Sequence, residues 1–240
     1  MFESYKVTLV RVTIELPNGD LSTGSAFHIG DGWLATAAHV VNSGELVEVV
    51  SERYSKKLEV EEIIYHDDER IDLALLKTNL DLTHHLETIF LPPPADGFIH
   101  TDHIPIGGHL DDWVGDEFIL SRVLLMGYPP VPFSRSPILV AAEGEVNAVL
   151  DKYTGDPVHF IISCMPRGGF SGGPVLSEYG FLLGIMTESL NHNDGFAETG
   201  FASVLSIEPL LVLLEKNGIY PGENREMVEM VSFSDDPTST

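Results

Sequence analysis

The chain is a succession of short apolar runs separated by turn-forming residues, and this pattern limits what it can fold into. Residues 5–15 and 24–29 alternate apolar and polar side chains around a Pro-Asn-Gly-Asp turn at 17–20, which predicts a β-hairpin. Further runs of strand length follow at 32–36, 46–50, 58–65, 73–77, 123–127, 138–149, 159–163, 174–176 and 181–187. Short strands at this spacing are typical of an all-β barrel or sandwich.

An irregular stretch divides the strand-rich sequence into two comparable halves. Between Leu91 and Gly115 the chain is rich in Pro, Gly, His and Asp. We therefore expect an N-terminal half at about residues 1–95, a connection at about 96–116 and a C-terminal half at about 117–205.

The sequence after the second half predicts one helix and a tail. Ser206-Ile207-Glu208-Pro209 precedes a run of apolar residues that ends before Gly218, and Pro is well tolerated in the first turn of a helix. We expect a closing helix at about 206–217. Residues 218–240 are acidic and contain Ser, Thr and Pro, which favours a flexible tail.

Composition favours one globular domain and disfavours nucleic-acid binding. Of the 240 residues, 43% are hydrophobic and 9% aromatic, which is enough for a sizeable core. The formal net charge of -24 would repel a polyanion, so we expect no nucleic-acid partner.

The cysteine count and the amino terminus favour a cytoplasmic protein. Cys164 is the single cysteine, so an internal disulfide is excluded and a reducing compartment is favoured. The first residues lack a basic start followed by a long apolar run, and no apolar segment reaches membrane-spanning length. We expect neither secretion nor a membrane partner.

The segment Arg167-Gly-Gly-Phe-Ser-Gly-Gly-Pro-Val175 places Ser171 among glycines that allow tight turns and close substrate approach, which suggests covalent catalysis. It also satisfies the G-x-S-x-G pattern of the α/β-hydrolase nucleophile elbow. That fold requires an acid and then a histidine downstream, and here only His192 follows, with Glu178 and Glu188 between. The spacing is too short and the alternating helices are absent, so the elbow interpretation is rejected.

Candidate partners for the serine lie upstream. A serine hydroxyl needs a neutral base and a carboxylate that orients the base. His39 follows a β-like run that ends in small residues, and Asp72 stands at the start of the apolar run Leu-Ala-Leu-Leu. Asp67 or Asp68 could supply the acid instead, although the place of Asp72 favours it. The chain order is then histidine, aspartate, serine.

Several ordered motifs now resemble those of the chymotrypsin/trypsin-like serine peptidases, and most of all the HtrA-like peptidase domains without disulfides. The similarity spans about residues 5–215 within an expected domain at 1–215. It is carried by Gly24-Ser25-Ala26-Phe27, Thr36-Ala37-Ala38-His39, Asp72-Leu73-Ala74-Leu75, Ser171-Gly172-Gly173-Pro174, Gly184-Ile185 and Thr199-Gly200-Phe201-Ala202.

The resemblance implies a fold and a mechanism. The fold is two six-stranded antiparallel β-barrels with the active site between them, plus a short C-terminal helix. In a serine endopeptidase of this kind Ser171 is the nucleophile, His39 the general acid/base and Asp72 the orienting carboxylate. The backbone amides of Gly169 and Ser171 form the oxyanion hole.

The resemblance also implies an apolar primary specificity pocket, which favours small or medium apolar substrate side chains. Its lining is expected from Met165, Pro166, Thr187, Glu188 and Phe201. Family members that are activated by amino-terminal cleavage carry an acid immediately before the nucleophile. This chain has Phe170 there, so we expect no such switch.

We expect no metal or other cofactor, and a protein or peptide substrate as the partner. A cluster between the halves matches no strong metal-ligand spacing; it comprises His100, Asp102, His103, His109, Asp111 and Asp112. The sequence does not indicate an oligomeric state. Two other functions stay open: a weakly catalytic or gated fold that binds proteins or peptides, and an esterase.

Overall fold

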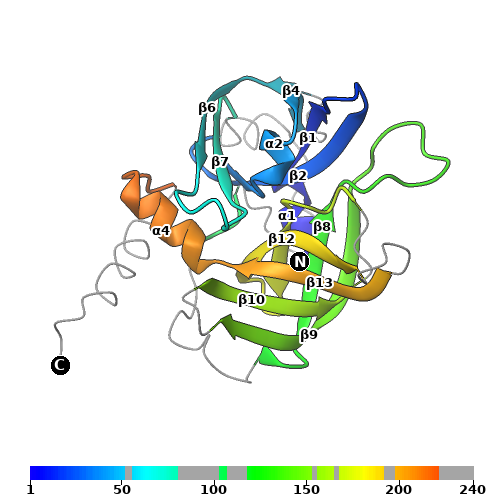
Figure 1. Ribbon diagram of the computed structural model, residues 1–240, viewed down its shortest axis with the longest axis vertical. Coiled ribbons are helices and arrows are strands. Elements are labelled where there is room, and N and C mark those ends of the chain that lie inside the picture. The colour runs from blue at the N-terminus through cyan, green and yellow to red at the C-terminus, as the bar shows by residue number, and fades with distance from the viewer. Residues whose placement is uncertain are drawn as a thin grey trace, which may run out of the picture.

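The computed structural model describes residues 1–51, 56–80, 103–106, 118–152, 156–164, 168–191 and 198–221. Its strands form two antiparallel units, one from each half of the sequence (Figure 1). The N-terminal sheet has the order β5-β4-β1-β2-β3-β7-β6. Its strands are β1 (Leu9–Glu15), β2 (Leu21–Gly30), β3 (Trp33–Thr36), β4 (Glu45–Ser51), β5 (Lys56–Leu58), β6 (Val60–Tyr65) and β7 (Ala74–Thr78).

The N-terminal sheet curls so that its two edge strands are consecutive in the chain. β5 pairs with β4 and β6 pairs with β7, yet only Glu59 separates β5 from β6. The N–H of Glu59 donates to Asn79 Oδ1 at 3.1 Å, and its carbonyl accepts from the N–H of Asn79 at 3.2 Å. The seven strands therefore correspond to the predicted six when β5 and β6 are taken as one strand that bends at Glu59.

The C-terminal unit is a closed six-stranded barrel, as predicted, with the order β10-β13-β12-β11-β8-β9. Its strands are β8 (Arg122–Gly127), β9 (Val140–Lys152), β10 (Asp156–Ser163), β11 (Pro174–Ser177), β12 (Leu182–Asn191) and β13 (Glu198–Ser206). β13 is missing from the predicted runs, because Gly200 and Ser203 interrupt its apolar residues. The all-β fold class is confirmed.

The predicted hairpin at the start of the chain is present, but its first strand begins later than expected. β1 and β2 pair from Leu9↔Phe27 to Glu15↔Leu21. Residues 2–8 instead form the short helices α1 (Phe2–Tyr5) and η1 (Lys6–Thr8). The Tyr5 hydroxyl donates to the carbonyl of Gly180 at 3.2 Å, so this segment lies against the C-terminal barrel rather than extending β1.

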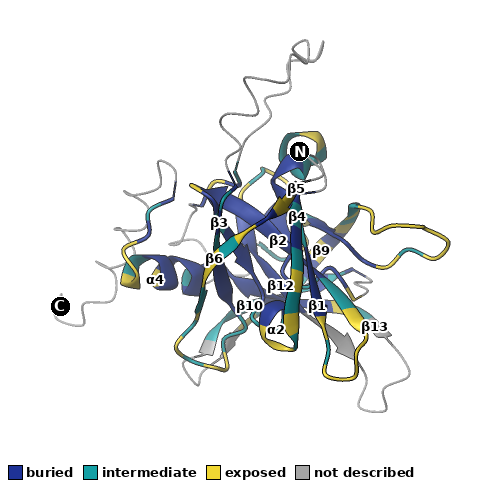
Figure 2. Cartoon of the chain, turned by 90° about the horizontal axis from the view of Figure 1, so that it is seen from above, coloured by how far each residue is buried: buried dark blue, intermediate teal, exposed yellow. Residues whose placement is uncertain are grey.

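The buried side chains form one core shared by both units and a second core inside the N-terminal sheet. The shared core includes Phe27 from β2 and Phe160 from β10, both fully buried. The second core includes Val10 and Val12 of β1. Figure 2 shows the buried strands at the centre and exposed residues in the loops. Because one core spans both units, they pack as a single body, which fixes the segments that lie between them.

One helix follows the barrel, as the sequence predicts. Helix α4 (Glu208–Lys216) starts with Glu208-Pro209 and buries its leucines, and Figure 1 shows it extending to one side of the barrel. Lys216 at its end pairs with Asp67 of the N-terminal half. No helix in the described part of the chain is long and apolar enough to cross a bilayer.

Two predicted segments fall largely outside the described residues. Of the connection at 96–116, residues 103–106 are described, and there the N–H of Ile104 donates to the carbonyl of His28 at 2.8 Å. The tail is described only as far as residue 221. The domain limits remain predictions.

Candidate active site

His39 and Asp72 are in direct contact. His39 Nδ1 lies 2.6 Å from Asp72 Oδ2, and the backbone N–H of His39 donates to Asp72 Oδ1 at 2.9 Å. The imidazole is 43% exposed and the carboxylate 28%, so the ring is open to solvent while its partner is more enclosed. A carboxylate only accepts hydrogen bonds, so the neutral ring carries its proton on Nδ1 and leaves Nε2 as an acceptor.

The pairing of two strands explains this contact. Thr36 at the end of β3 lies opposite Ala74 at the start of β7. His39 comes three residues after Thr36, at the start of helix α2 (His39–Asn42), and Asp72 comes two residues before Ala74. In an antiparallel pair the end of one strand lies beside the start of its partner strand. The side chains of His39 and Asp72 therefore converge at that edge of the sheet.

The alternative acids have other partners. Asp68 accepts from the Arg70 guanidinium at 2.9 Å, and hydrogen bonds from Arg70 lower the pKa of Asp68 to about 2. Asp67 pairs with Lys216. Of the three aspartates that the sequence leaves open, Asp72 is therefore the one that contacts His39.

Ser171 lies in a turn held between the two units. Its carbonyl accepts from the N–H of Ser25 in β2 at 2.8 Å, which ties the turn to the N-terminal sheet. On the other side the N–H of Gly172 donates to the carbonyl of Met186 at 2.8 Å. The N–H of Met186 donates in turn to the carbonyl of Gly173 at 2.9 Å. The backbone around Ser171 is thus anchored to β2 and β12.

The turn packs against the segment that carries His39. Gly172 has φ +80°, and a Cβ there would lie 2.2 Å from Thr36 Oγ1 and 3.0 Å from the backbone nitrogen of Ala37. Such a close approach requires glycine. No hydrogen bond joins the Ser171 hydroxyl to the His39 ring within the described ranges. Such bonds are often long in unliganded enzymes and tighten when substrate binds.

Gly169 is held by a serine that the sequence analysis did not assign. The Ser25 hydroxyl donates to the carbonyl of Gly169 at 2.6 Å and accepts from the N–H of Tyr128 at 3.0 Å. Ser25 is fully buried. The buried hydroxyl was the available signal, because buried polar groups are normally hydrogen-bonded, but its partner is 144 residues away.

Gly169 also meets the conformational requirement of a glycine. Its φ is +99°, and a Cβ would lie 2.4 Å from the carbonyl oxygen of Tyr128. The next residue, Phe170, is 4% exposed and belongs to the shared core. Apolar packing of Phe170 therefore holds the turn at the position where the sequence lacks an acid.

Two residues of the predicted specificity pocket lie on adjacent strands of the barrel. Thr187 in β12 is buried and donates to the carbonyl of Ser203 in the neighbouring β13, while Phe201 in β13 is 40% exposed. Glu188 belongs to β12. Met165 and Pro166 lie outside the described residues.

The described residues contain no group of three or more His, Cys, Asp or Glu side chains arranged to hold a metal ion. Of the histidine- and aspartate-rich cluster, only His103 is described. The other five residues of the cluster lie outside the described ranges.

A family model for a trypsin-like peptidase domain matches residues 24–185 of the chain. This match includes His39, Asp72 and Ser171. No curated protein matches the chain in sequence.

Solved protease structures share the fold. The active form of the Rv3671c protease from M. tuberculosis is 20% identical, with a TM-score of 0.63 over 90% of this chain and 83% of that one. The serine endoprotease from Yersinia pestis is 19% identical, with a TM-score of 0.60 over 91% of this chain and 66% of that one. The HtrA-type protease AlgW with tripeptide is 17% identical, with a TM-score of 0.61 over 90% of this chain and 61% of that one.

Proposed function

The chain belongs to the family of trypsin-like peptidase domains, and from this membership we propose that it is a serine endopeptidase that hydrolyses peptide bonds in protein substrates. The contact of His39 Nδ1 with Asp72 Oδ2, next to the turn of Ser171, is the observation that carries the proposal. A domain at about 1–215 contains all of these residues.

In the proposed mechanism Ser171 Oγ attacks the carbonyl carbon of the scissile peptide. His39 Nε2 takes the hydroxyl proton as the new bond forms, and then passes it to the leaving amine as the carbon–nitrogen bond breaks. Water, deprotonated by the same nitrogen, then attacks the acyl carbon; the bond to Ser171 Oγ breaks, and Nε2 returns the proton to that oxygen. Asp72 keeps the ring proton on Nδ1 and stabilises the imidazolium, since its oxygen lies 2.6 Å away.

The amides of Gly169 and Ser171 are the proposed donors to the oxyanion. Neither amide donates to another described residue, so both are available to a ligand. The peptide group after Gly169 is held through its carbonyl by Ser25 and Tyr128. Fixed donors aimed at a developing negative charge lower the barrier because they need no reorganisation during the reaction.

The proposed primary pocket is lined by Met165, Pro166, Thr187, Glu188 and Phe201. Thr187 and Phe201 lie on adjacent strands of the barrel, which supports this part of the assignment. Small or medium apolar side chains are its proposed substrates.

We propose the cytoplasm as the working compartment. Cys164 is buried and has no disulfide partner, and burial raises the pKa of its thiol, which makes it less reactive.

A fluorophosphonate probe tests the proposal directly, because it labels only an activated serine. We expect labelling of the wild-type chain, no labelling of Ser171→Ala and strongly reduced labelling of His39→Ala. Hydrolysis of denatured casein would then separate a peptidase from an esterase. A folded wild-type chain that neither labels nor cleaves would overturn the proposal and favour a binding module.

A further inference from the structure

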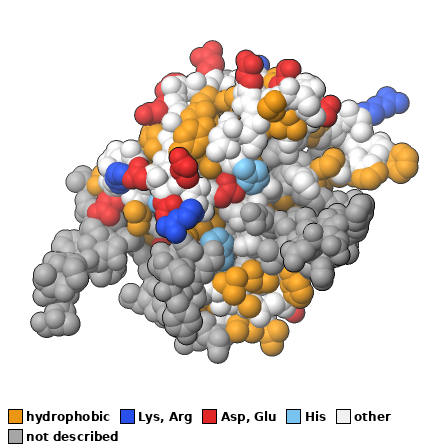
Figure 3. Space-filling model, in the orientation of Figure 1, with side chains coloured by type: hydrophobic (Ala, Val, Ile, Leu, Met, Phe, Trp, Pro, Cys, Tyr) orange, Lys and Arg blue, Asp and Glu red, His pale blue; other side chains and the backbone are white. Residues whose placement is uncertain are grey.

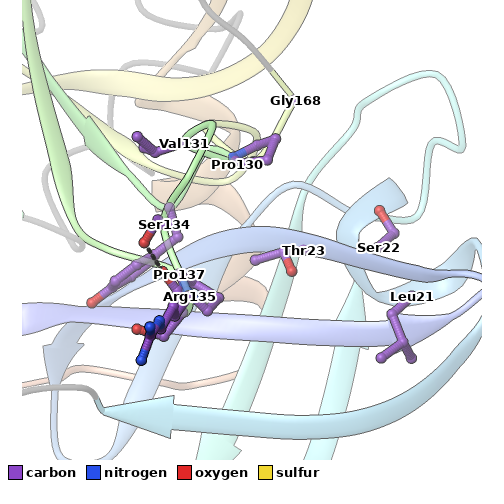
Figure 4. Close-up of a pocket in the computed structure, with 12 residues that line it drawn as sticks. Leu21, Ser22, Thr23, Pro130, Val131, Ser134, Arg135, Pro137 and Gly168 are labelled. Atoms are coloured by element: carbon purple, nitrogen blue, oxygen red, sulfur yellow. Dashed lines mark hydrogen bonds between the residues drawn. The ribbon is translucent and has the colours of Figure 1, made fainter.

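A cavity of about 410 Å³ lies beside the turn of Ser171, and this volume is within the range of ligand sites. Its walls come from the start of β2, the loop between β8 and β9, and the residues just before Ser171 (Figure 4). Of the proposed primary pocket, the described residues Thr187 and Phe201 do not line it. Gly169 lines it, and Gly169 is a proposed oxyanion donor.

The loop that forms one wall is held by proline residues and local hydrogen bonds. Pro130, Pro132 and Pro137 restrict its backbone. The N–H of Ser134 donates to the carbonyl of Val131 at 3.1 Å, and the Ser134 hydroxyl donates to the carbonyl of Ser136. The wall is therefore largely formed before any ligand binds, which reduces the entropy lost on binding.

Among the described residues that line the cavity, Arg135 is the one charged side chain, and none of them is a carboxylate. This is unusual in a chain with 37 Asp and Glu against 13 Lys and Arg. Figure 3 shows acidic side chains scattered over the upper, N-terminal half of the face it displays. In Figure 4, Arg135 lies beside Pro137, on the side of the cavity away from Leu21 and Ser22.

Arg135 also differs from the other described arginines. Arg11 pairs with Glu48 at 2.8 Å, Arg70 pairs with Asp68, and Arg122 lies 3.5 Å from Glu143. Arg135 makes no ion pair or hydrogen bond with another residue in the described ranges. Its guanidinium is therefore available to a ligand.

We propose that this cavity binds a carboxylate of the substrate through Arg135, so that the peptidase prefers an acidic group close to the scissile bond. The inference rests on the proposed function, because Gly169 connects the cavity to the reacting carbonyl. The planar guanidinium matches a carboxylate in charge and in hydrogen-bonding geometry. An acidic side chain and the free carboxyl end of a peptide carry the same chemistry, and the test separates them.

The effect is modest because Arg135 is exposed. Ion pairs at such positions change affinity by at most about fivefold. The overall negative charge of the chain opposes acidic ligands, but at physiological salt charges more than about 8 Å apart are largely screened. The local guanidinium then outweighs the distant carboxylates.

Cleavage of a quenched-fluorescence peptide library measures the preference. Each position in turn carries Asp, Glu, Asn or Gln, and the carboxyl end of every peptide is amidated. We expect the wild type to favour Asp or Glu over the amides by about threefold to fivefold at one position. Arg135→Gln should lose the preference, so that its rates on the Asp or Glu peptides and on the matching Asn or Gln peptides become equal. Arg122→Gln is the matched control, since Arg122 lies outside the cavity, and it should retain the preference.

Binding to Ser171→Ala separates the inference from the proposed function. Fluorescein-labelled library peptides are titrated by anisotropy, in one arm with an internal Glu and an amidated end, in the other with an internal Gln and a free carboxyl end. Tighter binding in the first arm identifies an acidic side chain as the group that Arg135 binds, and tighter binding in the second arm identifies the free carboxyl end of the peptide. In either arm the tighter binding should be lost in Arg135→Gln. Acid preference in binding without any cleavage would sink the proposed function and keep this inference. Equal affinity for acidic and amidated neutral peptides, or a preference that survives Arg135→Gln, overturns it.

Discussion

The hydroxyl of Ser25 donates a 2.6 Å hydrogen bond to the carbonyl of Gly169, so the N-terminal sheet holds the peptide that precedes the turn of Ser171. The backbone N–H of Ser25 also bonds the carbonyl of Ser171 itself. One residue of β2 thereby ties both proposed oxyanion residues to the unit that carries His39. Phe170 packs into the shared core between these two ties.

Ser25→Ala should lower turnover by about tenfold and leave KM nearly unchanged. Loss of the hydroxyl removes the 2.6 Å bond to the Gly169 carbonyl and leaves that carbonyl only the longer 3.3 Å bond from the Tyr128 N–H, which loosens the proposed oxyanion turn. Each 1.4 kcal/mol of barrier is about a factor of ten in rate. Steady-state kinetics on casein peptides check this. Ser177→Ala is the control, because this buried serine bonds only within its own barrel, to the N–H of Phe181. Unchanged turnover in Ser25→Ala would mean that the turn is held without the hydroxyl.

Asp72→Asn should reduce kcat by roughly four orders of magnitude, because an amide in place of the carboxylate favours the wrong tautomer of His39. Pre-steady-state and steady-state rates measure the loss. Asp68→Asn is the matched control: its carboxylate bonds Arg70 rather than His39, so activity should remain near wild type. If Asp68→Asn were the variant that loses activity, the assignment of the orienting acid would be wrong.

Gly169→Ala should reduce kcat by a hundredfold or more and destabilise the fold. Its positive φ disfavours alanine, and the new Cβ would meet the Tyr128 carbonyl oxygen at 2.4 Å, which displaces a proposed oxyanion donor. Activity assays and urea unfolding report the two effects. The neighbouring Gly168→Ala offers a close comparison, since nothing lies within 4 Å of its Cβ position, and it should unfold at the same urea concentration as wild type. Equal losses in both variants would contradict the argument.

Glu208→Gln should raise the melting temperature slightly at pH 7 and have no effect near pH 4. Burial raises the pKa of Glu208 above its ordinary value of 4.5, against a smaller opposing effect of the Ser206 hydroxyl. The folded state therefore favours the protonated form, and stability falls as the pH rises from 4.5 through the folded pKa. Calorimetry across pH 4–8 measures this, with Glu215→Gln on the same helix as the control. A gain that persists at pH 4 would point to packing instead of ionisation.

The prediction of the fold succeeded where local pattern and tertiary structure agree. The hairpin around residues 17–20 and the closing helix rest on turn residues and on apolar periodicity, which are local properties. Residues 5–8 were expected in a strand; they are helical instead, and Tyr5 contacts the C-terminal barrel at Gly180, a contact that no local pattern shows. The bend at Glu59 depends on Asn79, which is 20 residues away.

The sequence by itself determined the all-β class, the peptidase family and a short set of candidate site residues, because glycine placement, apolar periodicity and motif order are written along the chain. It favoured Asp72 over Asp67 and Asp68 as the partner of His39 without excluding them, and gave Ser25 no role. Only the tertiary structure decided these points. Strand pairing brings Asp72 to His39, and the shared core brings Ser25 against Gly169. Contacts between residues far apart in the chain depend on register and packing, which no local pattern encodes.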